Sequence, residues 1–202
     1  PQRGAGENAM AARTGQQFLD GLRKTNRTVW LGDERVDDVT THPELAGAAH
    51  TLAGVFDLQH DYPEECLIPD RETGSSINIS HMFPRSVEDL KRRNRGLSRI
   101  SEATVGLMGR TPDYMNVKFA CFAARHAMWA GADQGNEEGA QNLVRFQRHL
   151  AREDISLTHT IIHPTIDKVT DPRIVGNRVP LHKVGETAQC IIVRSGRILP
   201  IL

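Results

Sequence analysis

The amino-acid pattern of this 202-residue chain changes near Asp154, and this change constrains the fold more than any other feature. Apolar residues recur at helical spacing up to about residue 153, whereas turn signals and a strong β run, Gln189–Arg194, follow it. We therefore predict an α+β chain with three parts. A flexible N-terminal extension (1–12) precedes a mainly helical domain (13–154) and a β-domain (155–202), which is incomplete because an apolar run ends the sequence.

Capping signals place the first elements. Thr14 and Gln17 have the spacing of a capping box, which predicts a helix that begins here. The turn signal Gly32–Asp33 lies between Val29–Leu31 and Arg35–Val39, so we expect two short strands around it.

The next segments are a buried helix and a loop. Thr41 and Glu44 form a second capping-box pattern before an apolar helix. Residues 62–83 are rich in Pro, Gly, Ser and Asn and predict a long loop with one short strand at Cys66–Ile68. Its part 73–83 is either a segment that closes over a ligand or flexible surface.

Three further helices and a strand complete the prediction. Helices are expected from Ser86 to about Leu107, from Pro112 onward and over Ala140–Glu153. Residues 155–162 predict a strand that ends at Pro164.

The composition excludes several classes of protein. Lys plus Arg number 25 and Asp plus Glu also 25, so the balance argues against a protein that coats nucleic acid or an anionic membrane. No apolar run approaches the ~18–20 residues of a membrane span, and the N-terminus lacks a signal-peptide pattern. The cysteines, Cys66, Cys121 and Cys190, lie far apart, which is typical of reduced thiols in a cytoplasmic protein.

The segment MGRTPDYMN (108–116) brings a cation and a phenol to the start of a helix. Arg110 and Tyr114 are spaced to face one point, where the helix dipole also favours an anion such as a phenolate or carboxylate. The alternative is a helix start with a solvated Arg110.

The segment LTHTIIHP (157–164) supplies a group that titrates near neutrality. Strand alternation would put His159 and His163 on one face, where His159 can bind or deprotonate a substrate hydroxyl. Two such histidines are about 13 Å apart, too far to share a metal ion. The alternative is a histidine satisfied by a backbone carbonyl. The basic segment 90–99 is either a solvated helix face or a contact for a partner subunit.

Five ordered stretches resemble the oxygenase component of the 4-hydroxyphenylacetate 3-monooxygenase family of two-component aromatic hydroxylases. They are RTGQQFLDGLR (13–23), GDERVDDVTTHP (32–43), MGRTPDY (108–114), THTIIHPTIDK (158–168) and ETAQCIIVRSGR (186–197).

The resemblance implies a fold similar to acyl-CoA dehydrogenases, of which this chain would be only the N-terminal part. It further implies reduced FAD from a separate flavin reductase, O₂ as co-substrate, and a homo-oligomer, tetrameric in full-length relatives. The implied reaction hydroxylates a para-substituted phenol ortho to its OH through a C4a-hydroperoxyflavin, giving a catechol. A related CoA-ester dehydratase carries an iron–sulfur cluster, but no Cys lies between Cys66 and Cys121 to match its thiols.

The resemblance also implies roles for individual residues. Arg110, Tyr114 and His159 match the residues that surround the substrate hydroxyl, with His159 as the base. The residues that match the flavin-lining stretch are His159, Thr160, Ile161, Thr165, Ile166, Asp167 and Lys168. The alternative function is a catalytically inactive truncated remnant or a binding module of the same family.

Overall fold

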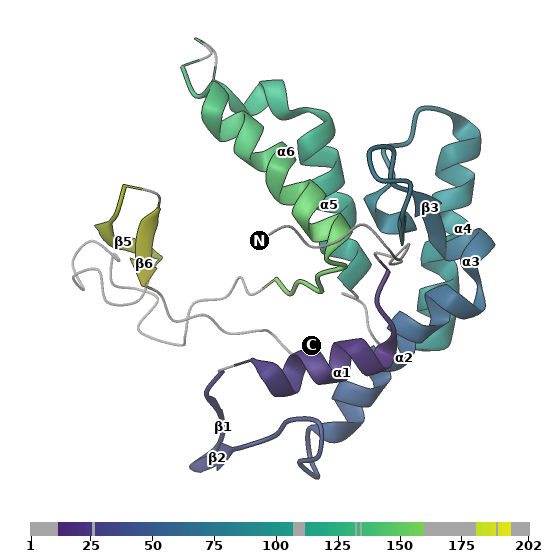
Figure 1. Cartoon of the computed structure of the whole chain (residues 1–202), viewed down its shortest axis with the longest axis vertical. Helices are drawn as coiled ribbons and strands as arrows, with labels where there is room; N and C mark the ends of the chain where they lie inside the picture. Colours follow the sequence, from purple (N-terminus) through teal and green to yellow (C-terminus); the bar gives the residue numbers. More distant parts are fainter. Residues whose placement is uncertain are drawn as a thin grey trace, which may run out of the picture. The chain divides into compact units, whose positions relative to one another are not determined.

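The structure, a computed structural model, describes residues 12–25, 27–106, 112–131, 133, 135–159, 181–188 and 190–194. It forms two compact units, Pro1–Leu157 and Thr158–Leu202. The first is helix-rich with two small antiparallel sheets, and the second contains one two-stranded sheet (Figure 1). This content agrees with the predicted α+β class; the predicted domain limits stay a prediction.

Helices α1 (Gly15–Lys24) and α2 (Ala46–Asp61) form the first core. The predicted capping box at the start of α1 is confirmed in both directions, between the Thr14 and Gln17 side chains and the backbone. Phe18 of α1 stacks on Phe56 of α2 with ring centroids 4.8 Å apart. Gly15 lets the helices approach closely, because a Cβ there would lie 2.4 Å from a carbonyl oxygen of α2.

The hairpin before α2 is confirmed, but the predicted helix start is wrong. Strands β1 (Val29–Leu31) and β2 (Glu34–Val36) pair antiparallel around Gly32. Helix α2 begins only at Ala46, without a side-chain cap. The preceding segment is held in a turn because Asp38 accepts hydrogen bonds from both the backbone N–H and the hydroxyl of Thr40, each at 2.7 Å.

Residues 62–83 are not a long loop. They contain α3 (Pro63–Cys66), β3 (Leu67–Pro69), β4 (Ser76–Asn78) and the 3₁₀ helix η1 (Ile79–His81), so the short predicted strand is confirmed within one residue. The prediction of flexible surface for 73–83 is wrong as well, because Ile77, Ile79, Ser80 and His81 are buried. The alternative, a segment that closes over a ligand, stays a prediction. The apolar positions pack this hairpin into the helical unit and outweigh its turn-like composition.

The remaining helices agree with the predictions in type. Helix α4 (Val87–Ala103) has Ser86 as N-cap, and α5 (Pro112–Ala124) begins at its predicted proline. The 3₁₀ helix η2 (His126–Trp129) precedes α6 (Glu137–Arg152). Helices α5 and α6 lie side by side, with Phe119 and Phe146 in an edge-to-face contact at 5.2 Å (Figure 1).

The segment after α6 does not form the predicted strand over residues 155–159. Asp154 adopts a left-handed conformation (φ 44°), and the N–H of Ile155 donates back to the Leu150 carbonyl, which closes the helix end. In the second unit, β5 (His182–Glu186) pairs antiparallel with β6 (Ile191–Arg194), which confirms the predicted β run. In the described part of the chain, no helix has the length and apolarity to cross a membrane.

Candidate functional site

The structure describes two of the predicted site residues. Tyr114 lies in the first turn of α5 in the first unit, with 43% of its surface exposed. His159 is half-buried and belongs to the second unit. The predicted convergence of Tyr114 and His159 with Arg110 on one substrate oxygen stays a prediction. The other predicted site residues lie outside the described residues: Arg110, Thr160, Ile161, Thr165, Ile166, Asp167 and Lys168.

The packing of α5 explains the exposure of Tyr114. Asn116, Ala120 and Ala123 are spaced along one helix face, and each is at most 4% exposed. Tyr114 precedes Asn116 by two residues, which rotates it about 200° around the helix at 100° per residue. The buried face therefore anchors the helix and leaves Tyr114 partly exposed on another face.

A hydrogen bond ties the buried face of α5 to η1. The Asn116 amide Nδ2 donates to the Ser80 hydroxyl over 3.1 Å, and both side chains are buried. The Ser80 backbone N–H in turn donates to Asn78 Oδ1 over 2.9 Å. The start of α5 is thus held by side chains that cap the neighbouring 3₁₀ helix.

This series of hydrogen bonds continues from Asn78 to Asp154 at the end of α6. Asn78 Nδ2 donates to Gln59 Oε1 over 3.0 Å, and Gln59 Nε2 donates to the Asp154 carboxylate over 2.8 Å. Gln59 Nε2 also donates to the Arg13 carbonyl, whereas the Arg13 backbone N–H donates to Asp154 Oδ2 over 2.9 Å. We call this set the buried polar network. Its members are Arg13, Gln59, Asn78, Ser80, Asn116 and Asp154.

The network holds the helix that carries Tyr114 against the point where the backbone leaves α6, five residues before His159. Burial raises the pKa of Asp154, although the hydrogen bonds from Gln59 and Arg13 and the Arg13 charge oppose this effect. The Arg13 guanidinium donates to the Asp154 backbone carbonyl and covers the Phe56 ring at 4.8 Å. A cavity of about 20 Å³, which has room for one water molecule, lies beside Gln59 and Asn116.

Sequence reasoning missed this network, but a signal for it exists. Gln59 continues the buried series Ala49, Ala53 and Phe56 on α2, so it is a polar residue on an apolar face. A polar side chain at such a position needs a buried partner. That partner, Asp154, lies 95 residues away, and no local pattern identifies it.

We next consider whether the described residues include a reactive cysteine or a metal site. Cys66 is fully buried, which raises the pKa of its thiol to about 11 and makes it unreactive at neutral pH. Cys121 and Cys190 are exposed free thiols. Within the described ranges, no three His, Cys, Asp or Glu side chains gather as metal ligands.

The fold is similar to solved structures of flavin-binding oxygenases. A structure of the oxygenase component of 4-hydroxyphenylacetate 3-monooxygenase complexed with FAD and 4-hydroxyphenylacetate superposes with a TM-score of 0.80 at 31% identity. The match covers 93% of this chain and 38% of the chain in that structure. An archaeal 4-hydroxybutyryl-CoA dehydratase from N. maritimus shares the fold alone, with a TM-score of 0.66 at 17% identity over 91% of this chain and 36% of that chain.

The chain belongs to the 4-hydroxyphenylacetate 3-hydroxylase family, whose N-terminal model matches residues 14–200. The 4-hydroxyphenylacetate 3-monooxygenase oxygenase component of Thermus thermophilus is 32% identical over 93% of this chain and 38% of its own length. The oxygenase component of 4-nitrophenol 2-monooxygenase from Rhodococcus is 30% identical over 95% of this chain and 36% of its own length. The chain thus spans little more than a third of these relatives.

Proposed function

We propose that this chain is the N-terminal part of a reduced-FAD-dependent monooxygenase that hydroxylates a para-substituted phenol ortho to its OH, giving a catechol. The observation that carries the proposal is the similarity, over 93% of the chain, to an oxygenase complexed with FAD and 4-hydroxyphenylacetate. The names of relatives that act on 4-hydroxyphenylacetate and 4-nitrophenol share a phenol with a para substituent, which supports this substrate class.

In the proposed site, Arg110, Tyr114 and His159 meet at the phenolic oxygen. The Arg110 guanidinium favours the phenolate, because a cation lowers the pKa of a neighbouring acid. The Tyr114 hydroxyl donates a hydrogen bond to the same oxygen, and a ring nitrogen of His159 accepts the phenolic proton. The exposure of Tyr114 on α5 supports this role, since the buried face of that helix holds the ring outward.

The expected flavin stretch suits the cofactor by its chemistry. Five of its members supply hydroxyl, carboxylate, ammonium and imidazole groups, which match the amide-like donors and acceptors of the flavin ring: His159, Thr160, Thr165, Asp167 and Lys168. Ile161 and Ile166 supply apolar surface. His159, the member that the structure describes, is half-buried, as a residue facing a ligand would be. When bound, reduced FAD supplies with O₂ the electrophilic oxygen that an electron-rich phenolate ring accepts. The proposal includes a separate flavin reductase, a homo-oligomeric assembly and an acyl-CoA dehydrogenase-like arrangement of the full-length protein.

The alternative is a binding module or inactive remnant that retains the phenol pocket without catalysis. The 202-residue chain spans 38% of the length of its Thermus relative, so the test below uses this chain itself. The two functions differ in product formation, whereas both allow binding of the phenol.

The test adds reduced FAD and a panel of para-substituted phenols to the 202-residue chain under air, with catechol measured by chromatography and phenol binding by difference absorbance. We expect catechol to disappear in Arg110→Ala and His159→Ala, and Tyr114→Phe to weaken phenol binding. His50→Ala, on an exposed position of α2, is the matched control and should change neither reading. Phenol binding without product favours the binding module. Neither binding nor product from a folded chain refutes both.

A further inference from the structure

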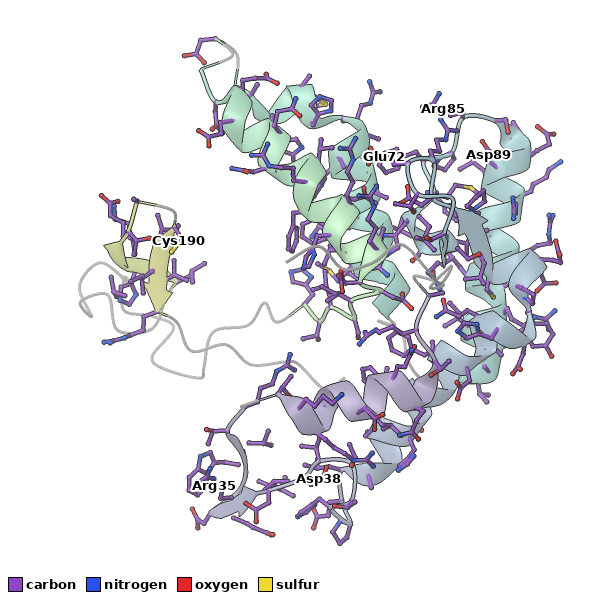
Figure 2. All side chains as sticks on the ribbon, in the orientation of Figure 1. Arg35, Asp38, Glu72, Arg85, Asp89 and Cys190 are labelled. Carbon is purple, nitrogen blue, oxygen red and sulfur yellow. The ribbon has the colours of Figure 1, made fainter. Side chains whose placement is uncertain are left out.

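A cleft of about 400 Å³ opens in the first unit, separate from the residues proposed to bind the phenol. It lies between the β3–β4 hairpin, η1, the start of α4 and the end of α6. Neither Tyr114 nor His159 lines it. Figure 2 shows Glu72, Arg85 and Asp89, three of its lining residues, at the same end of the helical unit. Its volume is in the range of small-molecule sites.

Arginines outnumber acidic residues in this cleft, which we call the arginine cleft. Among the residues that the structure describes, five arginines and three carboxylates line it, an excess of two positive charges. The carboxylates are already engaged. Asp70 accepts from Arg152 over 2.8 Å, Glu72 accepts from Arg148 over 2.8 Å and from Arg152, and Asp89 accepts from the backbone N–H of Arg85 over 2.8 Å.

The positive charges without an acidic partner belong to particular arginines of the cleft. Within the described residues, the guanidinium groups of Arg71 and Arg85 form no ion pair at contact distance, and both residues are exposed. Arg92 is half-buried and uses one nitrogen to donate to the Leu67 carbonyl over 3.0 Å, which orients its remaining N–H groups. A fixed guanidinium with free N–H groups is the arrangement that binds phosphate and carboxylate groups.

A second, independent observation comes from the wall of the arginine cleft. His81 lines it, is only 3% exposed, and has no hydrogen-bond partner at either ring nitrogen. Burial lowers the pKa of this imidazole to about 4, so the ring is neutral and carries one N–H donor and one acceptor. Leaving such a group without a hydrogen-bond partner destabilises the fold. A donor of this kind beside arginines is suited to an oxyanion.

We propose that the arginine cleft binds the phosphate group of a small molecule, held by Arg85, Arg92 and the His81 N–H. A tetrahedral phosphate accepts hydrogen bonds from several directions, which suits donors that come from both η1 and α4. The start of the 17-residue helix α4 lies at this cleft and adds the favourable end of its dipole. Among the described residues, the cleft and the proposed phenol site share none, and the inference does not depend on the proposed hydroxylation.

Binding is measured by isothermal titration calorimetry of the 202-residue chain with phenyl phosphate, inorganic phosphate and benzoate. We expect saturable binding of phenyl phosphate with a Kd below about 1 mM, with benzoate at least about tenfold weaker. Tighter binding of phenyl phosphate than of inorganic phosphate identifies a phosphoester as the ligand, and equal affinities identify free phosphate. Benzoate binding as tightly as phenyl phosphate overturns the assignment to phosphate.

Variants test the named donors. Arg85→Ala removes an exposed side chain, so the fold should persist, and we expect affinity for phenyl phosphate to fall about tenfold. His81→Leu removes the N–H donor but still fills the wall of the cleft, and it should also weaken binding. In the unsubstituted chain, the NMR resonances of the His81 ring should shift when phenyl phosphate is added. Arg35→Ala on the β1–β2 hairpin (Figure 2) is the matched control, expected to remain within about twofold. An unchanged affinity in Arg85→Ala, an equal loss in Arg35→Ala, or no saturable binding refutes the proposal.

Discussion

Replacing Gln59 with leucine removes the centre of the buried polar network while keeping a side chain of similar size. Gln59 is 2% exposed and makes three hydrogen bonds, to Asp154 at 2.8 Å, to the Arg13 carbonyl at 2.8 Å and from Asn78 at 3.0 Å. The bond to a carboxylate contributes about 1.5–3 kcal/mol and each neutral bond about 0.5–1.5 kcal/mol. Burial of the leucine side chain offsets about 1–2 kcal/mol of this loss. We expect the free energy of unfolding to fall by about 2–4 kcal/mol.

The measurement is urea unfolding followed by circular dichroism at pH 7, for the 202-residue chain and two variants. The matched control is Gln16→Leu on α1, because Gln16 also donates to a carboxylate, that of Asp20 at 2.8 Å, but is exposed. This control should change the free energy of unfolding by less than about 0.5 kcal/mol. If Gln59→Leu and Gln16→Leu destabilise equally, the network does not hold α5 against the end of α6 and the reasoning is refuted.

Three further predictions concern charge and packing in the first unit. Burial lowers the pKa of His81 from 6.5 to about 4, so the unfolded state binds this proton more tightly. The free energy of unfolding, taken relative to His81→Leu, should therefore fall by about 3 kcal/mol as pH decreases from 7 to 4, and a flat difference contradicts the burial of a neutral ring. The raised pKa of Asp154 has the opposite sign, so its ionisation destabilises the fold. The measurement is the free energy of unfolding of the unsubstituted chain minus that of Asp154→Asn. This difference should decrease as pH rises from 4 to 7, and an increase would contradict the raised pKa. Gly96→Ala would place a Cβ 2.5 Å from the Glu65 carbonyl oxygen and should cost about 1–3 kcal/mol in thermal unfolding. Gly54→Ala, with no atom within 4 Å, is its control and should stabilise α2 by up to about 1 kcal/mol, so equal effects of the two exchanges would rule out the clash.

Local signals predicted those elements whose stabilising contacts are themselves local. The capping box of Thr14 and Gln17 joins residues three apart, and Ser86 caps α4 in the same way. Thr41 and Glu44 have an equivalent spacing, but no capping occurs there. The carboxylate of Asp38 takes the donors of Thr40 and holds the turn instead. A competing side chain two residues away outweighs a capping pattern, and composition alone does not rank the two.

The predictions of a loop over residues 62–83 and of a strand over residues 155–159 were wrong for a different reason. Ile79 is fully buried under elements distant in sequence, and this burial converts an apparently loop-like stretch into a hairpin and a 3₁₀ helix. Residues 155–159 have apolar residues suited to a strand, but Asp154 adopts a left-handed conformation stabilised by Arg13 and Gln59. Both outcomes depend on partners distant in sequence, among them Gly96 beside Ile79, and Arg13 and Gln59 at Asp154.

The sequence by itself determined the helix starts with intact caps, the α+β class and the ordered motifs that assign the family, because these properties depend on residues close together in the chain. It also nominated Arg110, Tyr114 and His159 through those motifs. Only the tertiary structure decided that Gln59 and Asp154 are buried partners, that Tyr114 faces outward from α5, and that His81 lies in the wall of an arginine cleft. Burial and pairing of polar groups arise from contacts between distant segments, and these contacts exist only once the helices have packed.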